Sequence, residues 1–206
     1  MNRSGLAVTR TRRTLLPNPR RVIAKPFLPG EEIVGGGKSR AGLLVDRILE
    51  LPEPEVASAL AGVMTDFSLR HKGFEQILEQ HFEQVAHHIA SGMHLSRERR
   101  LLIGAYFTHE YSVEAAALFN PSMVLAPDQS HLPVGHRRFV MSLRAVGEGH
   151  ISSIEFRSGT IDTKNEVTFD PVGSKLVNGQ RAAPGSYDKK LFGAKLGELG
   201  AANDIA

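Results

Sequence analysis

The 206-residue chain contains no cysteine and no tryptophan. Without cysteine it forms no disulfide, no zinc–thiolate site and no cysteine nucleophile. Aromatic residues make up only 6% of the chain, which is low for an all-β sandwich. The sequence has no apolar run long enough to cross a membrane, and its basic N-terminus lacks the apolar segment of a secretory leader. These absences predict a soluble, cytoplasmic protein with no membrane partner.

The net charge of +3 is unevenly distributed along the chain. Residues 1–25 carry seven basic side chains and no acidic one. Prolines in residues 1–38 favour extended backbone, so this region is predicted to be a basic extended arm. Such an arm is typical either of a solvated tail or of an element that binds phosphate or nucleic acid. The basic residues are Arg3, Arg10, Arg12, Arg13, Arg20, Arg21 and Lys25.

Apolar residues recur at helical spacing in residues 39–119 and predict four helices. Serines suit the N-caps of the first and fourth helices, and a proline suits the first turn of the second. The apolar spacing of the fourth continues to Leu118, so Asn120-Pro121 is expected to end it. The expected helices begin at Ser39, Pro54, Phe74 and Ser96.

After Pro121 the apolar period changes from 3.6 residues to two, which is typical of strands. Phe139, Met141, Leu143 and Ala145 then fall on one face of a strand over residues 138–146. A second strand from His150 to Arg157 and a short third one at Val167–Phe169 complete an antiparallel meander over residues 120–170.

Helices followed by strands predict an α+β fold. Residues 171–206 are expected to form a loop and a short C-terminal helix, built on Leu191, Ala194, Leu196 and Leu199. Three strands would leave two open edges, and the sequence stops directly after the expected last helix. Both features are typical of a fragment of a larger protein.

Two stretches resemble motifs but fail at a required position. Gly35-Gly36-Gly37-Lys38-Ser39 would need a glycine where Glu32 stands to form a phosphate-binding P-loop, so we interpret it as a flexible linker. His109-Glu110 begins like a zinc-protease helix, but Val113 occupies the position of the second histidine. No metal and no cofactor is therefore predicted.

Polar side chains crowd one strand pair around the turn at Gly147-Glu148-Gly149. Arg144 lies on a strand face that otherwise carries Val and Ser, and His150 and Ser152 are expected to project together from the next strand. Such sets of donors and acceptors on rigid strands recognise sugar hydroxyls. A solvent-facing strand surface with a satisfied arginine accounts equally well for the pattern.

Three stretches of this chain look familiar: LLPNPRRVIAKPFLPG (residues 15–30), RRLLIGAYFTHEYSVEAAALFNPS (99–122) and RFVMSLRAVGEGHISSIEFRSGTID (138–162). They resemble the N-terminal section of glycoside hydrolase family 130, in the branch with a helical extension before the propeller. DFSLRH (66–71) and YDKKLFGAKLGELGAANDIA (187–206) fit that branch as well. The resemblance covers most of the chain.

The resemblance implies a five-bladed β-propeller acting on β-mannosides or related oligosaccharides, with the meander as part of its first blade. Most members use inorganic phosphate as a co-substrate, some use water, and an Asp protonates the leaving oxygen. The Asn-Pro segment and the first-blade Arg of the family help to form the sugar pocket. By position, these roles would fall to Asn120, Ser122 and Arg144, with His150, Ser152 and Ser153 nearby.

One departure from the family pattern concerns catalysis. The family's acid lies in a Glu-Asp-Ala-Arg or Glu-Asp-Pro-Arg segment, which this sequence lacks. Glu148, Glu155 and Asp162 do not match that motif, so no catalytic residue is assigned. Because glycosidic cleavage requires a proton donor, the chain is expected to be inactive alone. Its expected partner is a downstream half of the enzyme or further copies of itself.

A second hypothesis comes from a different class of function. The four helices and the basic arm could form a module that binds protein or nucleic acid, with the strands as structural support. No aromatic-rich RNA-binding platform accompanies the arm, so nucleic acid is not the expected partner. This hypothesis ranks below the sugar-processing one.

Overall fold

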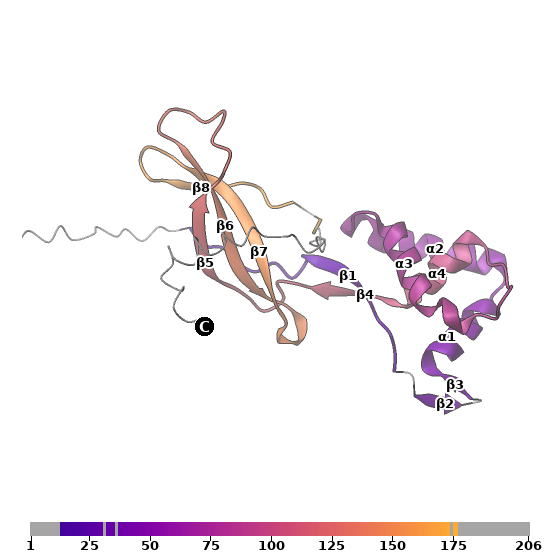
Figure 1. Cartoon of the computed structure of the whole chain (residues 1–206). Helices are drawn as coiled ribbons and strands as arrows, with labels where there is room; N and C mark the ends of the chain where they lie inside the picture. Colours follow the sequence, from indigo (N-terminus) through magenta and orange to yellow (C-terminus); the bar gives the residue numbers. More distant parts are fainter. Residues whose placement is uncertain (1–12, 31, 36, 174, 177–206) are drawn as a thin grey trace, which may run out of the picture.

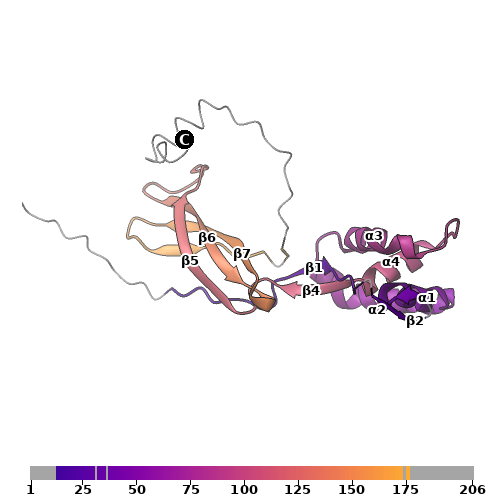
Figure 2. The same cartoon turned by 60° about the horizontal axis from the view of Figure 1, so that its bottom comes forward.

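The computed structural model describes residues 13–30, 32–35, 37–173 and 175–176, which form an α+β fold (Figure 1). Four α-helices lie together at one end, and a four-stranded antiparallel sheet lies at the other. A two-stranded ribbon of β1 (Val22–Pro26) and β4 (Thr108–Ser112) runs between them in both views (Figures 1 and 2). The predicted fold class and helix count are therefore confirmed.

The helices begin close to where their sequence signals predicted. Ser39 and Ser96 cap the first and fourth helices, and their side chains accept hydrogen bonds from the backbone of Gly42 and Arg99. The third helix is shorter than expected, because a 3₁₀ turn replaces its last turn. The elements are α1 (Arg40–Leu49), α2 (Glu53–Phe67), η1 (Ser68–Arg70), α3 (Phe74–Val85), η2 (Ala86–His88) and α4 (Arg97–Tyr106).

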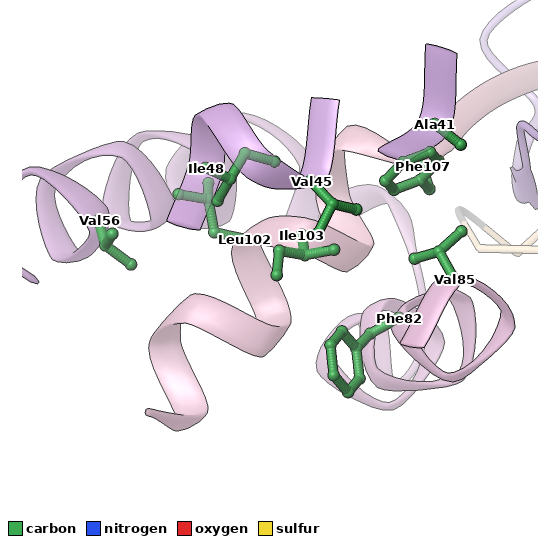
Figure 3. Close-up of a cluster of buried hydrophobic side chains, with 9 residues drawn as sticks. All are labelled: Ala41, Val45, Ile48, Val56, Phe82, Val85, Leu102, Ile103 and Phe107. Carbon is green, nitrogen blue, oxygen red and sulfur yellow. The ribbon is translucent and has the colours of Figure 1, made fainter. Parts of the chain in front are cut away.

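The apolar faces of these helices meet in a core that all four share (Figure 3). Gly104 lets α4 lie close against α3, because a Cβ on it would lie 1.9 Å from the carbonyl oxygen of Leu78 on α3. The buried side chains of the core are Ala41, Val45, Ile48, Val56, Phe82, Val85, Leu102, Ile103 and Phe107.

The expectation that the fourth helix continues to Leu118 is wrong. It ends at Tyr106, and Thr108–Ser112 form β4, which pairs with β1. The fully buried ring of Phe107 marks the point where the backbone leaves the helix. Thr and Tyr favour strands, and pairing with β1 satisfies the backbone of both segments.

The N-terminal arm is also more ordered than predicted over its described residues. Besides β1, it contains a hairpin of β2 (Ile33–Gly35) and β3 (Lys38–Ser39). Gly37 has a φ of +73°, which glycine adopts without steric cost. Gly35, Lys38 and Ser39 are thus paired in a hairpin, so the prediction of a flexible linker is wrong for these residues.

The sheet has the order β5-β6-β7-β8, one strand more than the sequence predicted. The extra strand is β5, whose first residues were expected to end the fourth helix. The predicted alternation on β6 is confirmed, since Phe139, Met141, Leu143 and Ala145 are all buried. The strands are β5 (Ala117–Leu125), β6 (Arg137–Val146), β7 (Ser152–Ile161) and β8 (Val167–Phe169), with a 3₁₀ turn, η3 (Glu148–His150), before β7.

The ribbon packs against both ends of the molecule. At the sheet, the hydroxyl of Tyr111 lies 3.2 Å from the carbonyl oxygen of Glu148 and 3.3 Å from that of Ile151. At the helices, Ala24 joins a buried cluster with Leu78 and Leu101. The ribbon therefore joins the core of the helices and is hydrogen-bonded to the turn before β7.

The expected C-terminal helix at residues 191–199 lies outside the described residues. None of the helices that the structure does describe is long and apolar enough to cross a membrane.

Candidate sugar-binding face

The two faces of the four-stranded sheet differ in what covers them. Residues opposite one another in register share a face, so the buried side chains of β6 define a covered face. Leu15 of the N-terminal segment packs against this face. We call the other side the open face, and its central residues are Phe119, Ser122, Val124, Val140, Ser142, Arg144, Ser152, Ile154 and Phe156.

Arg144 is the charged group at the centre of the open face. Its Nε and Nη2 donate hydrogen bonds of 3.0 and 2.9 Å to the hydroxyl oxygen of Ser152. The guanidinium carbon lies 5.4 Å from the ring centroid of Phe119, within cation–π distance. The side chain is nevertheless exposed to solvent. Because a guanidinium has five N–H donors, Arg144 keeps donors beyond the two that Ser152 receives.

Asn120 and Ser122 flank Arg144 on the neighbouring strand. The register of β5 shifts between Phe119 and Ser122, which indicates a β-bulge there. Asn120 lies in the bulge with a φ of +51°, a left-handed conformation that Asn tolerates better than most residues. Ser122 pairs with Ser142, which lies two residues from Arg144 on β6 and on the same face. Four of the six predicted site residues therefore lie near one another: Asn120, Ser122, Arg144 and Ser152.

The remaining two predicted site residues lie apart from this group. Ser153 pairs with Ala145, so strand alternation places it on the covered face. His150 belongs to the turn η3 and has a φ of +59°, so it does not project from the strand beside Ser152 as expected. Phe119 is the site residue that sequence reasoning missed. The sequence feature that could have identified it is its position directly before Asn120-Pro121.

None of the three carboxylates considered as proton donors is arranged as a general acid. Hydrogen bonds from the backbone N–H groups of Glu166 and Lys164 lower the pKa of Asp162, which favours the ionised form. Glu155 forms ion pairs with Arg21 at 2.7 Å and Arg157 at 3.3 Å. Glu148 is exposed in the turn η3.

Buried charges lie behind the sheet, on its covered face. The Glu114 carboxylate lies 2.5 Å from Arg157 Nη2 and 2.7 Å from Arg21 Nε, the latter an ion-pair contact and not an aligned hydrogen bond. The backbone N–H of Asn18 donates to its other oxygen. This network joins β7 to the N-terminal segment, so we interpret it as a structural feature.

A second polar cluster lies at the helical end, beside an apolar pocket lined by Val63 and Phe67. Arg70 donates to both carboxylate oxygens of Glu110 at 2.7 and 2.9 Å, and His71 Nε2 lies 2.8 Å from one of them. Burial opposes the ionisation of Glu110, but these hydrogen bonds outweigh it and lower the pKa of its carboxyl group. The three polar groups satisfy one another and fasten β4 to the helices.

In the described part of the chain, no group of three or more His, Asp or Glu side chains is arranged to hold a metal ion. No protein-family model, curated protein or solved structure matches the chain.

Proposed function

We propose that this chain supplies part of the sugar-binding pocket of a carbohydrate-active enzyme that resembles the β-mannoside phosphorylases and glycosidases of family 130. The four-stranded sheet would act as the first blade of its propeller. The chain binds a β-mannoside or a related oligosaccharide through the open face and does not cleave it alone. Inorganic phosphate or water is the nucleophile of the completed enzyme.

The observation that carries this proposal is the setting of Arg144. Its guanidinium is held by Ser152 and Phe119 and still faces solvent, beside Asn120 and Ser122. A fixed guanidinium next to amide and hydroxyl groups offers several donors and acceptors at low entropic cost, which suits sugar hydroxyls.

The strand arrangement also supports the idea of a blade. Propeller blades are four-stranded antiparallel sheets, and this sheet is a four-stranded meander of order β5-β6-β7-β8. The missing Glu-Asp-Ala-Arg or Glu-Asp-Pro-Arg segment supports the lack of cleavage, and none of Glu148, Glu155 and Asp162 is arranged to donate the proton instead.

The alternative function is a module that binds protein or nucleic acid through its basic arm. Two of the seven basic residues of the arm are already engaged within the protein, which argues against it. Arg21 is held in ion pairs with Glu114 and Glu155. Lys25 places its Nζ 4.6 Å from the ring centroid of Tyr111. Neither is free to follow a nucleic-acid backbone in this conformation, so we prefer the sugar-binding proposal.

The first test is binding of β-1,4-mannobiose, followed by chemical-shift titration of the labelled chain. We expect the shifts to cluster around Arg144, and Arg144→Ala to weaken binding about tenfold or more, because hydrogen bonds from a charged group are lost. Arg137→Ala is the matched control, since Arg137 is exposed on the same strand but away from the open face. Equal binding by both variants would contradict the proposed site.

The second test is phosphate-dependent release of mannose 1-phosphate. The purified chain should release none from a panel of β-mannosides, and activity should appear when a catalytic half that carries the Glu-Asp-Ala-Arg type segment is added. Turnover by the chain alone would show that one of its own carboxylates serves as the acid, and the proposal would then be wrong on this point.

A further inference from the structure

Large apolar side chains on the β7 side of the open face are exposed. Ile154 is 61% exposed and Phe156 is 64% exposed, although both lie within the ten-residue strand β7. Val124, on the same face, is exposed to a similar degree. Soluble proteins rarely leave contiguous apolar surface of this kind uncovered, so a covering element is expected.

The described chain ends beside these residues. After β8 it returns along β7, where Asp170 donates its backbone N–H to the carbonyl oxygen of Ser158. Val172 and Leu176 then line a groove together with Ile154 and Phe156. Leu176 is already half-buried there. The next residues of the chain therefore start at the edge of the exposed apolar surface.

The sequence that follows has the composition to cover this surface. Leu191, Phe192, Leu196 and Leu199 recur at a spacing that places them on one side of the predicted C-terminal helix. Residues 177–186 can span about 30 Å when extended, since each residue contributes ~3.3 Å. That reach is comparable to the length of a ten-residue strand, about 33 Å. The helix can therefore arrive anywhere along β7.

We infer that residues 187–200 dock on the β7 side of the open face and cover Ile154 and Phe156. Phe119 and Asn120 lie on β5, on the other side of Arg144, and stay open. A tethered segment is favoured over a second copy, because its effective concentration is in the millimolar range.

Disulfide trapping tests this inference directly, because the chain has no native cysteine. In the full chain, Ile154→Cys is combined in turn with Phe192→Cys, Leu196→Cys and Leu199→Cys, and each pair is oxidised gently. At least one pair should form an intramolecular disulfide about tenfold or more faster than the controls, because a disulfide needs Cα atoms within about 7 Å. Non-reducing gels and peptide mass spectrometry give the rate and the linkage.

Two controls change the position of one cysteine each. Ile154→Cys with Lys190→Cys places the second cysteine on the opposite side of the predicted helix. Met123→Cys with Leu196→Cys places the first one on the covered side of the sheet, where Met123 is partly exposed. Phe156→Cys replaces Ile154→Cys if that variant does not give a normal unfolding transition.

The results separate the possible occupants of the surface. Fast intramolecular linkage in a test pair alone supports docking of the chain's own segment. Disulfide-linked dimers would overturn it in favour of a second copy, and equal rates in tests and controls, or no disulfide at all, would overturn it as well. The inference does not depend on the proposed function, because mannobiose binding is measured separately.

Discussion

Glu114 and Arg157 form an ion pair in the interior of the protein, with side chains 0% and 6% exposed. Arg157 comes from β7, whereas Glu114 lies between β4 and β5. Arg21 of the N-terminal segment contacts the same carboxylate. One buried acid thus holds three separate segments together on the covered face of the sheet.

Replacing this acid should destabilise the protein strongly. Glu114→Gln removes the fully buried carboxylate of the two that compensate Arg21 and Arg157, and leaves only Glu155. We therefore expect a loss of about 3 kcal/mol in the free energy of unfolding. Urea denaturation measures it. Glu166→Gln is the control, because Glu166 is exposed and its change should stay within about 0.5 kcal/mol. A loss below about 1 kcal/mol for Glu114→Gln would contradict the structural role.

Arg99 closes the C-terminus of α1 by binding backbone carbonyl groups. Its guanidinium donates to the carbonyl oxygens of Ile48, Leu49 and Leu51 and to the Glu53 carboxylate. We expect Arg99→Ala to lower the free energy of unfolding by about 3 kcal/mol, because buried acceptors lose their donors. Arg99→Lys should recover only part of it, since an ammonium lacks the planar fork of donors.

The matched control for Arg99 is the nearby Arg97, whose ion pair with Glu75 has side chains 60% and 48% exposed. Arg97→Ala should cost no more than about 1 kcal/mol, as is usual for exposed pairs. Similar losses in both variants, measured by urea denaturation, would show that Arg99 does not have this special role.

Two helical glycines should respond to alanine in opposite directions. At Gly104 a Cβ would lie 1.9 Å from Leu78 O, so Gly104→Ala must push α4 away from α3 and should cost about 3 kcal/mol or more. At Gly62, on the exposed side of α2, a Cβ would meet nothing within 4 Å. Gly62→Ala should stabilise by about 0.5–1 kcal/mol. Thermal unfolding of both variants tests the pair, and a stable Gly104→Ala would contradict the close helix contact.

The protein should lose stability as the pH falls below 6.5, in part through His81. Burial, with a smaller effect of His109, lowers the pKa of His81 from its ordinary value of 6.5. Above pH 6.5 the side chain is neutral in both states. Between 6.5 and the lower folded pKa, only the unfolded chain takes up the proton, so the free energy of unfolding decreases.

Unfolding midpoints between pH 8 and pH 5 measure this effect. His81 Nδ1 lies 2.6 Å from the hydroxyl oxygen of Thr108, whose own proton goes to Gly104 O. Asn offers a similar N–H donor without titrating, so His81→Asn should flatten the pH dependence in this window. The exposed His94 gives the control, His94→Asn, which should leave the slope unchanged. An unaltered slope in His81→Asn would exclude His81 as the cause.

Several features of this protein were determined by local sequence. Ser39 and Ser96 cap helices because their side chains accept backbone hydrogen bonds within one turn. The alternation from Phe139 to Ala145 determined which side of β6 is buried, since strand geometry alone places alternate residues on one face.

Other features depended on contacts between distant segments. The apolar spacing of the fourth helix continues past residues 108–112 to Leu118, but these residues form a strand because β1 offers a backbone partner. Pairing across the strands also decided the candidate site. It brought Arg144 to Ser152 and Asn120, and it placed Ser153 on the other face, because neighbours in sequence alternate sides while partners in register share one. Residue types in the sequence predicted the kind of site, and only the tertiary structure could decide which of those residues meet.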